Sequence, residues 1–394
     1  MSNKEKKQEK RDSSSSSSGS SSSNDSDGEP KNTSPSSDLV LTKYNMAAEI
    51  VNTVLKELIA EVKEGVEVGY LCTYGDKRIA MPTCVSVDNC VCHFSPLASE
   101  PKVLLKNGQL VKLDLGAHID GYIATVAHTL VVGASKENKI SGKKADVIMA
   151  AYNVMEMVLR MLKPEKNFKN NEITDHINQL TKIYATTPVE NMLSHQMERF
   201  KINGTKQIIQ NPSEEQKTKM EKCGFENFEV YAVDVLVSTG EGKVKTHDAR
   251  TTVYKKTDDF VYSLKMKASR AFYHEAQLKF GLMPFSLRLF DDEVKAKMGV
   301  LECERHGLMQ PYQVLYDREG EFVAQFKTTA IIMPSGIFKL TGLPLNTENL
   351  ACDVKIEDEK ILGLLKGQLK PKKKKLAGKK PENSENNKVE KPVV

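Results

Sequence analysis

The sequence contains no run of 18 or more apolar residues, although 39% of its 394 residues are apolar. A helix needs about 20 mostly apolar residues to cross a membrane, so we expect no membrane insertion. The first residues, MSNKEKKQEKR, are charged and have no apolar stretch behind them, which argues against a signal peptide. These absences together favour an intracellular protein.

Paired cysteine motifs are also lacking. The seven cysteines are scattered and odd in number, and none of them forms a CxxC pair. This pattern argues against a disulfide framework and against a zinc knuckle, so we expect reduced thiols. The segment STGEGK (238–243) has two glycines near a lysine but not the spacing of a phosphate-binding P-loop, and we expect an ordinary loop there.

Composition divides the chain into three parts. Residues 1–38 contain a serine tract with almost nothing to bury, and we expect them to be disordered. Residues 39–350 carry the periodic apolar pattern of a folded domain. Residues 351–394 include the short apolar stretch ILGLL (361–365) and then a lysine-rich tail, which we also expect to be disordered.

Within the folded part, helical and strand patterns both occur. Apolar residues spaced three to four positions apart predict helices at 43–64, 144–162 and 172–184. A further helical region, interrupted at Met283-Pro284, predicts an insert at about 262–316. With strands in between, the pattern indicates a mixed α/β (α+β) domain with a helical insert.

The clearest strand signal is a hairpin at 111–132, with the two-residue turn Asp120-Gly121. Such a turn pairs residues whose numbers sum to 241, so Asp114 faces Ala127 and Gly116 faces Thr125. Asp114 and Thr125 therefore lie on one face of the hairpin as diagonal neighbours.

Two later strands carry single charges. The predicted strands at 229–238 and 321–333 place Asp234 and Lys327 within apolar segments. Buried charges need partners, so these two residues are candidates for a site.

Five segments resemble, in chain order, the ligand-bearing segments of type II methionine aminopeptidases, over about Lys43 to Pro344. They are MPTCVSVDNCVCHFSP (81–96), VKLDLGAHIDGYIAT (111–125), MLSHQM (192–197), EVYAVDVLVSTGEG (229–242) and VAQFKTT (323–329). The resemblance implies that Asp114 and His195 stand at metal-ligand positions and that His93 faces the substrate. It also implies that Thr125 replaces an aspartate, Asp234 a glutamate, and Lys327 the bridging glutamate.

These replacements have a chemical consequence. Two adjacent divalent cations need bridging carboxylates, because each cation takes several oxygen ligands and the two cations repel each other. An ammonium at Lys327 would repel a metal and could pair with Asp114 and Asp234. We therefore expect a salt-bridged pocket without metal or other cofactor. The alternative is an active methionine aminopeptidase with a reduced site, in which Asp114, His195 and Asp234 hold a single metal.

The substitutions, the insert and the basic tail most resemble the proliferation-associated, ErbB-receptor-binding protein family. The resemblance implies a pita-bread fold of the aminopeptidase/creatinase-like type without peptidase activity. It also implies binding of structured RNA, ribosomal particles and transcription or receptor-tail protein partners, in growth, translation and transcription control. The implied locations are the cytoplasm and the nucleus, including the nucleolus. A histone or chromatin chaperone is a third possibility, against which the helical insert argues.

One departure from the family lies between Asp76 and Ala80, where the chain is shorter by about twenty residues. An expected helix is missing. Either a neighbouring helix covers the gap, or the sequence represents a shortened isoform or gene model.

Basic residues gather in two places. The first is the tail, whose lysines carry charge of one sign and predict contact with nucleic-acid phosphates together with a nuclear or nucleolar address; the alternative is a solvated tail. Its members are Lys366, Lys370, Lys372, Lys373, Lys374, Lys375, Lys379 and Lys380. The second group opens the insert and could extend an RNA footprint: Lys255, Lys256, Lys265, Lys267 and Arg270. The stretch ILGLL approximates a coregulator LxxLL box, but Ile361 replaces the first leucine, and the pattern favours a plain helix packed on the domain.

Overall fold

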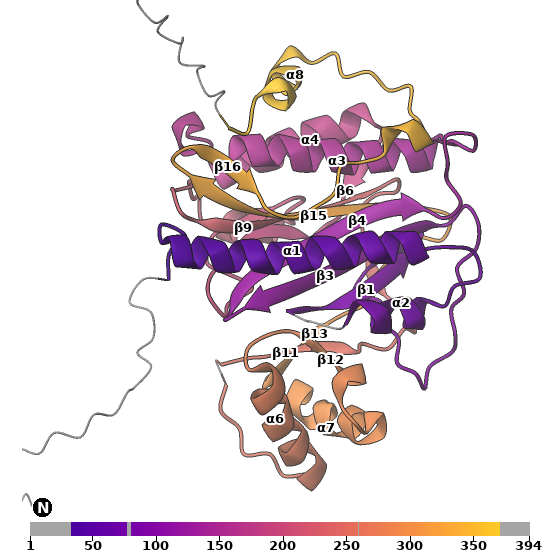
Figure 1. Ribbon diagram of the computed structural model, residues 1–394, viewed down its shortest axis with the longest axis vertical. Coiled ribbons are helices and arrows are strands. Elements are labelled where there is room, and N and C mark those ends of the chain that lie inside the picture. Colours follow the sequence, from indigo (N-terminus) through magenta and orange to yellow (C-terminus); the bar gives the residue numbers. More distant parts are fainter. Residues whose placement is uncertain (1–32, 77–79, 259, 371–394) are drawn as a thin grey trace, which may run out of the picture. The chain divides into compact units, whose positions relative to one another are not determined.

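The computed structural model describes residues 33–76, 80–258 and 260–370 (Figure 1). Its centre is a nine-stranded antiparallel sheet with the strand order β1-β3-β4-β15-β9-β7-β8, in which β16 also pairs with β15 and β6 with β9. The strands are β1 (Met81–Val87), β3 (Leu110–Ile119), β4 (Tyr122–Val131), β6 (Thr187–Pro188), β7 (Leu193–Met197), β8 (Gln207–Ile209), β9 (Val230–Ser238), β15 (Val323–Met333) and β16 (Gly336–Lys339).

The β3–β4 hairpin has the predicted register. Asp120 and Gly121 both adopt positive φ angles, 50° and 83°, which the tight turn requires. Asp114 pairs with Ala127 and Gly116 with Thr125, so the sum of 241 is confirmed. Across the sheet, Ala127 pairs with Lys327 and Lys327 with Asp234. One row across four strands therefore runs Asp114, Ala127, Lys327, Asp234.

Helices cover one face of this sheet (Figure 1). Alternate residues of β3 and β4, such as Leu113 and Val126, pack with α1 and α2 in one cluster, whereas Val233 and Phe326 pack with α3 and α4 in another. The charged row projects to the opposite face, because successive strand residues alternate. The helices are α1 (Asp38–Glu61), α2 (Val68–Gly75), α3 (Lys143–Met161) and α4 (Asn170–Ile183). The three predicted helices are confirmed, although α1 begins earlier than expected.

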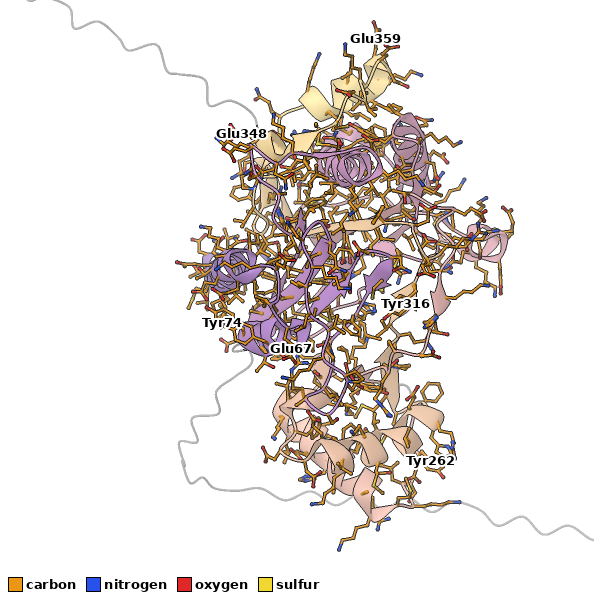
Figure 2. All side chains as sticks on the ribbon, turned by 90° about the vertical axis from the view of Figure 1, so that its right-hand side faces the viewer. Glu67, Tyr74, Tyr262, Tyr316, Glu348 and Glu359 are labelled. Atoms are coloured by element: carbon orange, nitrogen blue, oxygen red, sulfur yellow. The ribbon has the colours of Figure 1, made fainter. Side chains whose placement is uncertain are left out.

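The insert contains two helices, α6 (Lys267–Phe280) and α7 (Glu293–Arg305), and a small sheet of β11 (Val253–Lys256), β12 (Phe285–Ser286) and β13 (Met309–Tyr312). The helices approach closely at Gly299, where a Cβ would lie 2.5 Å from the Cβ of Phe272. Asp292 caps α7 by accepting hydrogen bonds from two backbone amides. In Figure 2, Tyr262 marks this region, and its ring stacks on His306 at 3.6 Å.

Arg288 joins the insert to the main sheet region. Its guanidinium forms a buried ion pair with Asp76 and donates a hydrogen bond to the carbonyl of Pro96 at 3.0 Å. Asp76 also accepts a hydrogen bond from the amide of Thr83 at 2.7 Å. The chain on the N-terminal side of residues 77–79, which lie outside the described residues, is thus fixed to both the insert and β1.

The last helix, α8 (Glu359–Lys366), packs on α3. Ile361 is completely buried in the cluster beneath it, and Leu364 and Leu365 are partly buried there. The apolar side chains of ILGLL therefore serve as core residues in this structure, which favours the packed helix over the coregulator box. No helix among the described residues is long and apolar enough to cross a membrane. The remaining elements are β2 (Cys90–Cys92), β5 (Ile140–Ser141), α5 (Glu214–Lys219), β10 (Lys245–Thr246), β14 (Leu315–Tyr316) and β17 (Leu350–Ala351).

Candidate functional site

An ion-paired cluster lies on the face of the sheet opposite to helices α1 to α4. The Nζ atom of Lys327 is 2.9 and 2.7 Å from the two carboxylate oxygens of Asp114, and 3.0 Å from Oδ2 of Asp234. The side chains of Lys327 and Asp114 are 9% and 4% exposed, so the charges interact with little screening by water. The register places one carboxylate on each side of the lysine, and its ammonium pairs with both.

Gln325 completes the cluster. Its side-chain amide donates to Oδ1 of Asp234 at 2.9 Å and to Oδ2 of Asp114 at 3.3 Å. The backbone of Asp234 is fixed as well, because Ser194 donates to its carbonyl at 3.1 Å and accepts from its amide at 3.0 Å. All four carboxylate oxygens of the two aspartates therefore accept hydrogen bonds within the cluster.

Burial and charge act together on these groups. Burial alone lowers the pKa of Lys327, but the Asp114 and Asp234 carboxylates outweigh it and the net shift is upward. Burial raises the pKa of Asp234, and the ammonium of Lys327 opposes that rise only in part. A protonated lysine is thus held firmly in place.

The two predicted histidines flank the cluster. His195 lies on β7 opposite Ala232, with its Nδ1 atom 3.4 Å from the carbonyl oxygen of Gln196. Burial, with a smaller contribution from the charge of Lys327, lowers the pKa of His195 to about 4. His93 follows β2 with a positive φ of 62°. Burial also lowers the pKa of His93, whose Nδ1 atom is 3.1 Å from the carbonyl of Gln313. Both imidazoles are therefore neutral near pH 7.

Thr125 contributes no charge to the cluster. Its amide donates to the hydroxyl of Thr329 at 2.8 Å, and the two hydroxyls are 3.5 Å apart. The hairpin register thus places a neutral oxygen where the family resemblance implies a lost carboxylate.

A cavity of about 160 Å³ adjoins the cluster and is lined by residues that include Met81, His93, Thr125, His195, Asp234 and Lys327. The predicted site residues are therefore brought together. Tyr312, from β13, also lines it, and among the described residues its hydroxyl has no hydrogen-bond partner. Tyr312 and Gln325 were not predicted as site residues. No local sequence motif indicates that β13 packs beside the cluster, and the role of the Gln325 amide becomes clear only once the structure places it next to Asp114 and Asp234.

The residues present do not fit a two-metal centre. A divalent cation between the aspartates would meet the ammonium of Lys327, and both aspartates already use their oxygens for Lys327 and Gln325. Within the described ranges, no three His, Cys, Asp or Glu side chains form a group that could hold a metal ion.

Comparison with known proteins places this geometry in a family. The model of metallopeptidase family M24 matches residues 42–230. ERBB-3 binding protein 1 of Arabidopsis thaliana is 41% identical over 90% of this chain and 92% of its own length. The chain belongs to the proliferation-associated, ErbB-3-binding protein family.

Two further relatives agree with that assignment. The Curved DNA-binding protein of Schizosaccharomyces pombe is 39% identical over 88% of this chain and 95% of its own length. The solved structure of a thermophilic Arx1 is 32% identical, has a TM-score of 0.79, and is matched over 85% of this chain and 99% of that one. The predicted aminopeptidase-like pita-bread fold is thereby confirmed for this member of the family.

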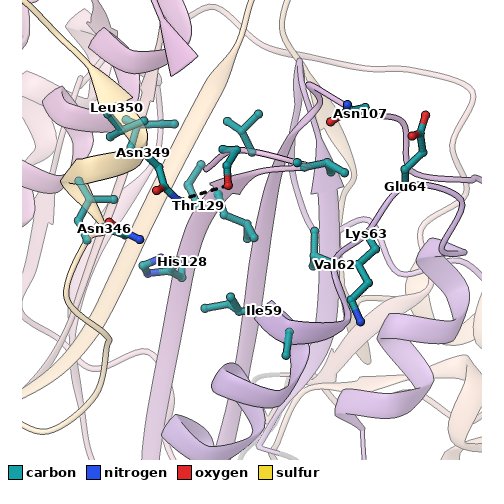
Figure 3. Close-up of a pocket in the computed structure, with 18 residues that line it drawn as sticks. Ile59, Val62, Lys63, Glu64, Asn107, His128, Thr129, Asn346, Asn349 and Leu350 are labelled. Atoms are coloured by element: carbon teal, nitrogen blue, oxygen red, sulfur yellow. Dashed lines mark hydrogen bonds between the residues drawn. The ribbon is translucent and has the colours of Figure 1, made fainter. Parts of the chain in front are cut away.

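A second cavity, of about 530 Å³, lies between the end of α1, the end of β4 and residues 345–350 (Figure 3). Ile59, Leu130 and Leu350 line it together with His128. His128 is 7% exposed, and burial lowers its pKa to about 4. Lys63 and Glu64 also line this cavity, but both are exposed, whereas the charges of the Lys327 cluster are buried.

The predicted basic residues differ in the contacts that they make. In the insert, Arg270 donates to the carbonyls of Leu264 and Lys265 at 2.9 and 2.7 Å, and Lys256 pairs with Asp258 at 3.4 Å. These two cations therefore also make contacts within the fold, and the idea that the five insert cations could extend an RNA footprint stays a prediction. Of the tail lysines, Lys366 and Lys370 are described and exposed, and the other six lie outside the described residues.

Proposed function

We propose that this protein is a catalytically inactive member of the aminopeptidase fold that binds structured RNA, ribosomal particles and protein partners. The observation that carries the inactivity is the ammonium of Lys327 between Asp114 and Asp234, at the position where the resemblance implies a bridging glutamate. Peptide hydrolysis in such a site needs a metal to polarise the carbonyl and to activate water. In this cluster both carboxylates are already paired with the ammonium of Lys327.

Nucleic-acid binding is supported by the lysines of the C-terminal segment. Between 366 and 380 there are eight lysines and no acidic residue, and neutralisation of phosphates by lysine releases counterions. A relative is named as a DNA-binding protein, which agrees with this chemistry. Because A-form RNA is recognised largely through shape and backbone, structured RNA is the partner we propose.

We infer the protein partners and the locations from the family to which the chain belongs. Relatives carry the names ErbB-3 binding protein and proliferation-associated protein. We extend to this chain receptor-tail or transcription partners, roles in growth, translation and transcription control, and locations in the cytoplasm, nucleus and nucleolus. Sedimentation with ribosomal subunits from the native cell tests the ribosomal part, and absence of the protein from the subunit fractions would contradict it.

The test of inactivity combines elemental analysis with hydrolysis of a Met-Ala-Ser peptide. We expect neither stoichiometric metal nor turnover after incubation with Co²⁺, Mn²⁺ or Zn²⁺. An active aminopeptidase with a single metal is the alternative. Stoichiometric metal together with turnover that Asp114→Ala abolishes would establish that alternative and overturn our proposal.

RNA binding is tested by replacing the six lysines from 372 to 380 with glutamine. We expect weaker binding to an RNA hairpin and a flatter dependence of log Kd on log salt concentration, by nearly one unit of slope for each phosphate that is no longer neutralised. Fluorescence anisotropy over a series of KCl concentrations measures both quantities. An unchanged slope would place the RNA-binding surface outside the tail.

A further inference from the structure

The insert helix α7 has apolar side chains on two faces. One face packs on α6, with Val300 and Cys303 buried in the core of the insert. The other face is uncovered, because Val294, Met298 and Leu301 are 60%, 56% and 55% exposed. These three side chains are four and three residues apart, so they lie in one row along the helix. We call them the α7 row.

The spacing of the α7 row suits contact with one other helix. Apolar residues that alternate between four and three positions form the seam of a coiled coil, in which two helices lie side by side. Single exposed apolar side chains are ordinary on a protein surface, whereas a continuous row of them indicates an interaction site. The row therefore fits a second helix that lies along α7.

The two ends of the α7 row carry opposite charges. Asp291 stands just before the capping residue of the helix, and Arg305 is the last helical residue. Both side chains are exposed. In the part of the chain that the structure describes, neither of them forms an ion pair. Each end can therefore pair with a charge of opposite sign on another molecule.

Other charged residues of α7 are already engaged. Lys295 pairs with the capping residue Asp292 at 3.0 Å. Glu304, next to Arg305, accepts a hydrogen bond from the hydroxyl of Tyr254 at 3.2 Å. The free charges thus stay negative at the beginning of the row and positive at its end.

We propose that the α7 row binds the α7 row of a second copy of this chain, with the two helices antiparallel. A two-fold contact uses the same surface of both copies, so that surface must be complementary to itself. Antiparallel alignment places Met298 of one copy beside Leu301 of the other. It also brings Arg305 of each copy to within one turn of Asp291 of the other, and it opposes the two helix dipoles. A parallel alignment would place like charges together at both ends.

The contact is small, so the dimer is weak. Three apolar side chains from each copy bury less than the roughly 1,200 Å² of a stable protein interface. We therefore expect a dissociation constant on the order of 100 μM. The inference does not depend on RNA binding.

The first experiment measures the sedimentation velocity of the full chain over a concentration series that spans this value. Met298→Ser/Leu301→Ser removes most of the α7 row. The control Met46→Ser/Leu104→Ser changes the same residue types at positions outside the insert that are 48% and 52% exposed. We expect wild type and control to dimerise alike, and the row variant to bind itself more than about tenfold more weakly, because four apolar side chains leave each dimer.

A charge exchange tests the antiparallel arrangement. Arg305→Asp and Asp291→Arg each place like charges together across the two-fold axis, and we expect either one to weaken the dimer by about 3- to 10-fold. The double variant Asp291→Arg/Arg305→Asp restores opposite charges, so we expect its dimer to regain the wild-type affinity. Far-UV circular dichroism checks that each variant is folded. A purely structural role of these residues would not produce this recovery.

Each other outcome overturns the inference. A wild-type chain that stays monomeric over the whole series contradicts it, and so does a dimer that the row variant still forms. If the double charge variant remains as weak as the single ones, the antiparallel contact is wrong. If the wild type is monomeric but the row variant no longer sediments with ribosomal subunits, the row binds a different protein, and the proposed function stands without the dimer.

Discussion

Lys327, Lys366 and Lys370 all carry an ammonium group, but their surroundings differ. Lys327 is 8% exposed and lies between two carboxylates, so its charge is cancelled within a few ångströms. Lys366 and Lys370 are exposed, and a tail with no acidic residue before Glu382 follows them. We propose that the first arrangement excludes a cationic ligand and that the second attracts an anionic one. In this proposal the same side chain prevents metal binding at one place and supports anion binding at another.

The strongest test of this contrast is Lys327→Met. The substitution leaves two buried carboxylates without their cation, and removal of one partner from a buried ion pair costs about 3–5 kcal/mol. Urea denaturation measures the loss, and we expect RNA affinity to stay unchanged. The control Lys327→Met/Asp114→Asn/Asp234→Asn removes the uncompensated charges and should recover much of the stability. An unchanged midpoint for the single variant would show that the cluster does not support the fold.

We expect acid to lower the stability of the fold around His195 and to leave the charge of the exposed lysines unchanged. The pKa of His195 is lowered to about 4 in the folded protein, whereas an unfolded histidine titrates near 6.5. Its contribution to stability is therefore complete above pH 6.5 and is lost as the pH falls toward 4, by at most about 3 kcal/mol. The raised pKa of Asp234 acts in the opposite direction, because the folded state then binds the proton more readily.

The difference between wild type and His195→Gln isolates the histidine. Urea midpoints at pH 7, 6, 5 and 4.5 provide the measurement. We expect the wild type to lose more stability than His195→Gln across this range. Parallel curves for the two proteins would contradict the lowered pKa of His195.

The variant Ile361→Ala tests the packing of α8, the helix that precedes residues 367–370. Ile361 is completely buried against α3, and truncation of a buried isoleucine costs about 2 kcal/mol or more. We expect hydrogen exchange in α8 to become faster. We also expect RNA affinity to fall slightly, because residues 367–370, which follow α8, are then held less firmly. Lys360→Ala, at a neighbouring exposed position, is the matched control. Equal exchange rates in the two variants would contradict the packing role of Ile361.

The smallest effect is expected in the insert. Lys256 and Arg270 already have partners within the fold, and Lys265 and Lys267 are two exposed members of that basic group. We expect Lys265→Gln/Lys267→Gln to change RNA affinity by less than about twofold, since two isolated surface cations offer a weak phosphate contact. A loss as large as that caused by replacing the tail lysines would make the insert a main part of the RNA-binding surface.

Local sequence rules predicted the part of the site that depends on the register of the β3–β4 hairpin. A two-residue turn fixes every pair in a hairpin, so the position of Thr125 beside Asp114 followed from Asp120-Gly121 alone. The pairing of Lys327 with both aspartates followed from the family resemblance together with the cost of a buried charge. These predictions depend on single strands and single residues.

The features that the sequence did not predict join segments far apart in the chain. Arg288 reaches Asp76 across 212 positions, and Arg160 reaches Gly367 across 207. The strands β11 and β13 were missed because each has four residues and sits among helical patterns. No periodicity within a short window encodes such contacts, because they arise only when packing brings the elements together.

Ala127 gives the cluster a requirement beyond its charges. It occupies the β4 position between Asp114 and Lys327 in the row across the sheet and is 2% exposed. The lysine side chain reaches β3 over this alanine, which offers only a methyl group as an obstacle. We therefore expect a larger side chain at this position to obstruct the contact between the lysine and Asp114. In other chains of this fold, the size of that one side chain should tell whether a lysine opposite it can close the site.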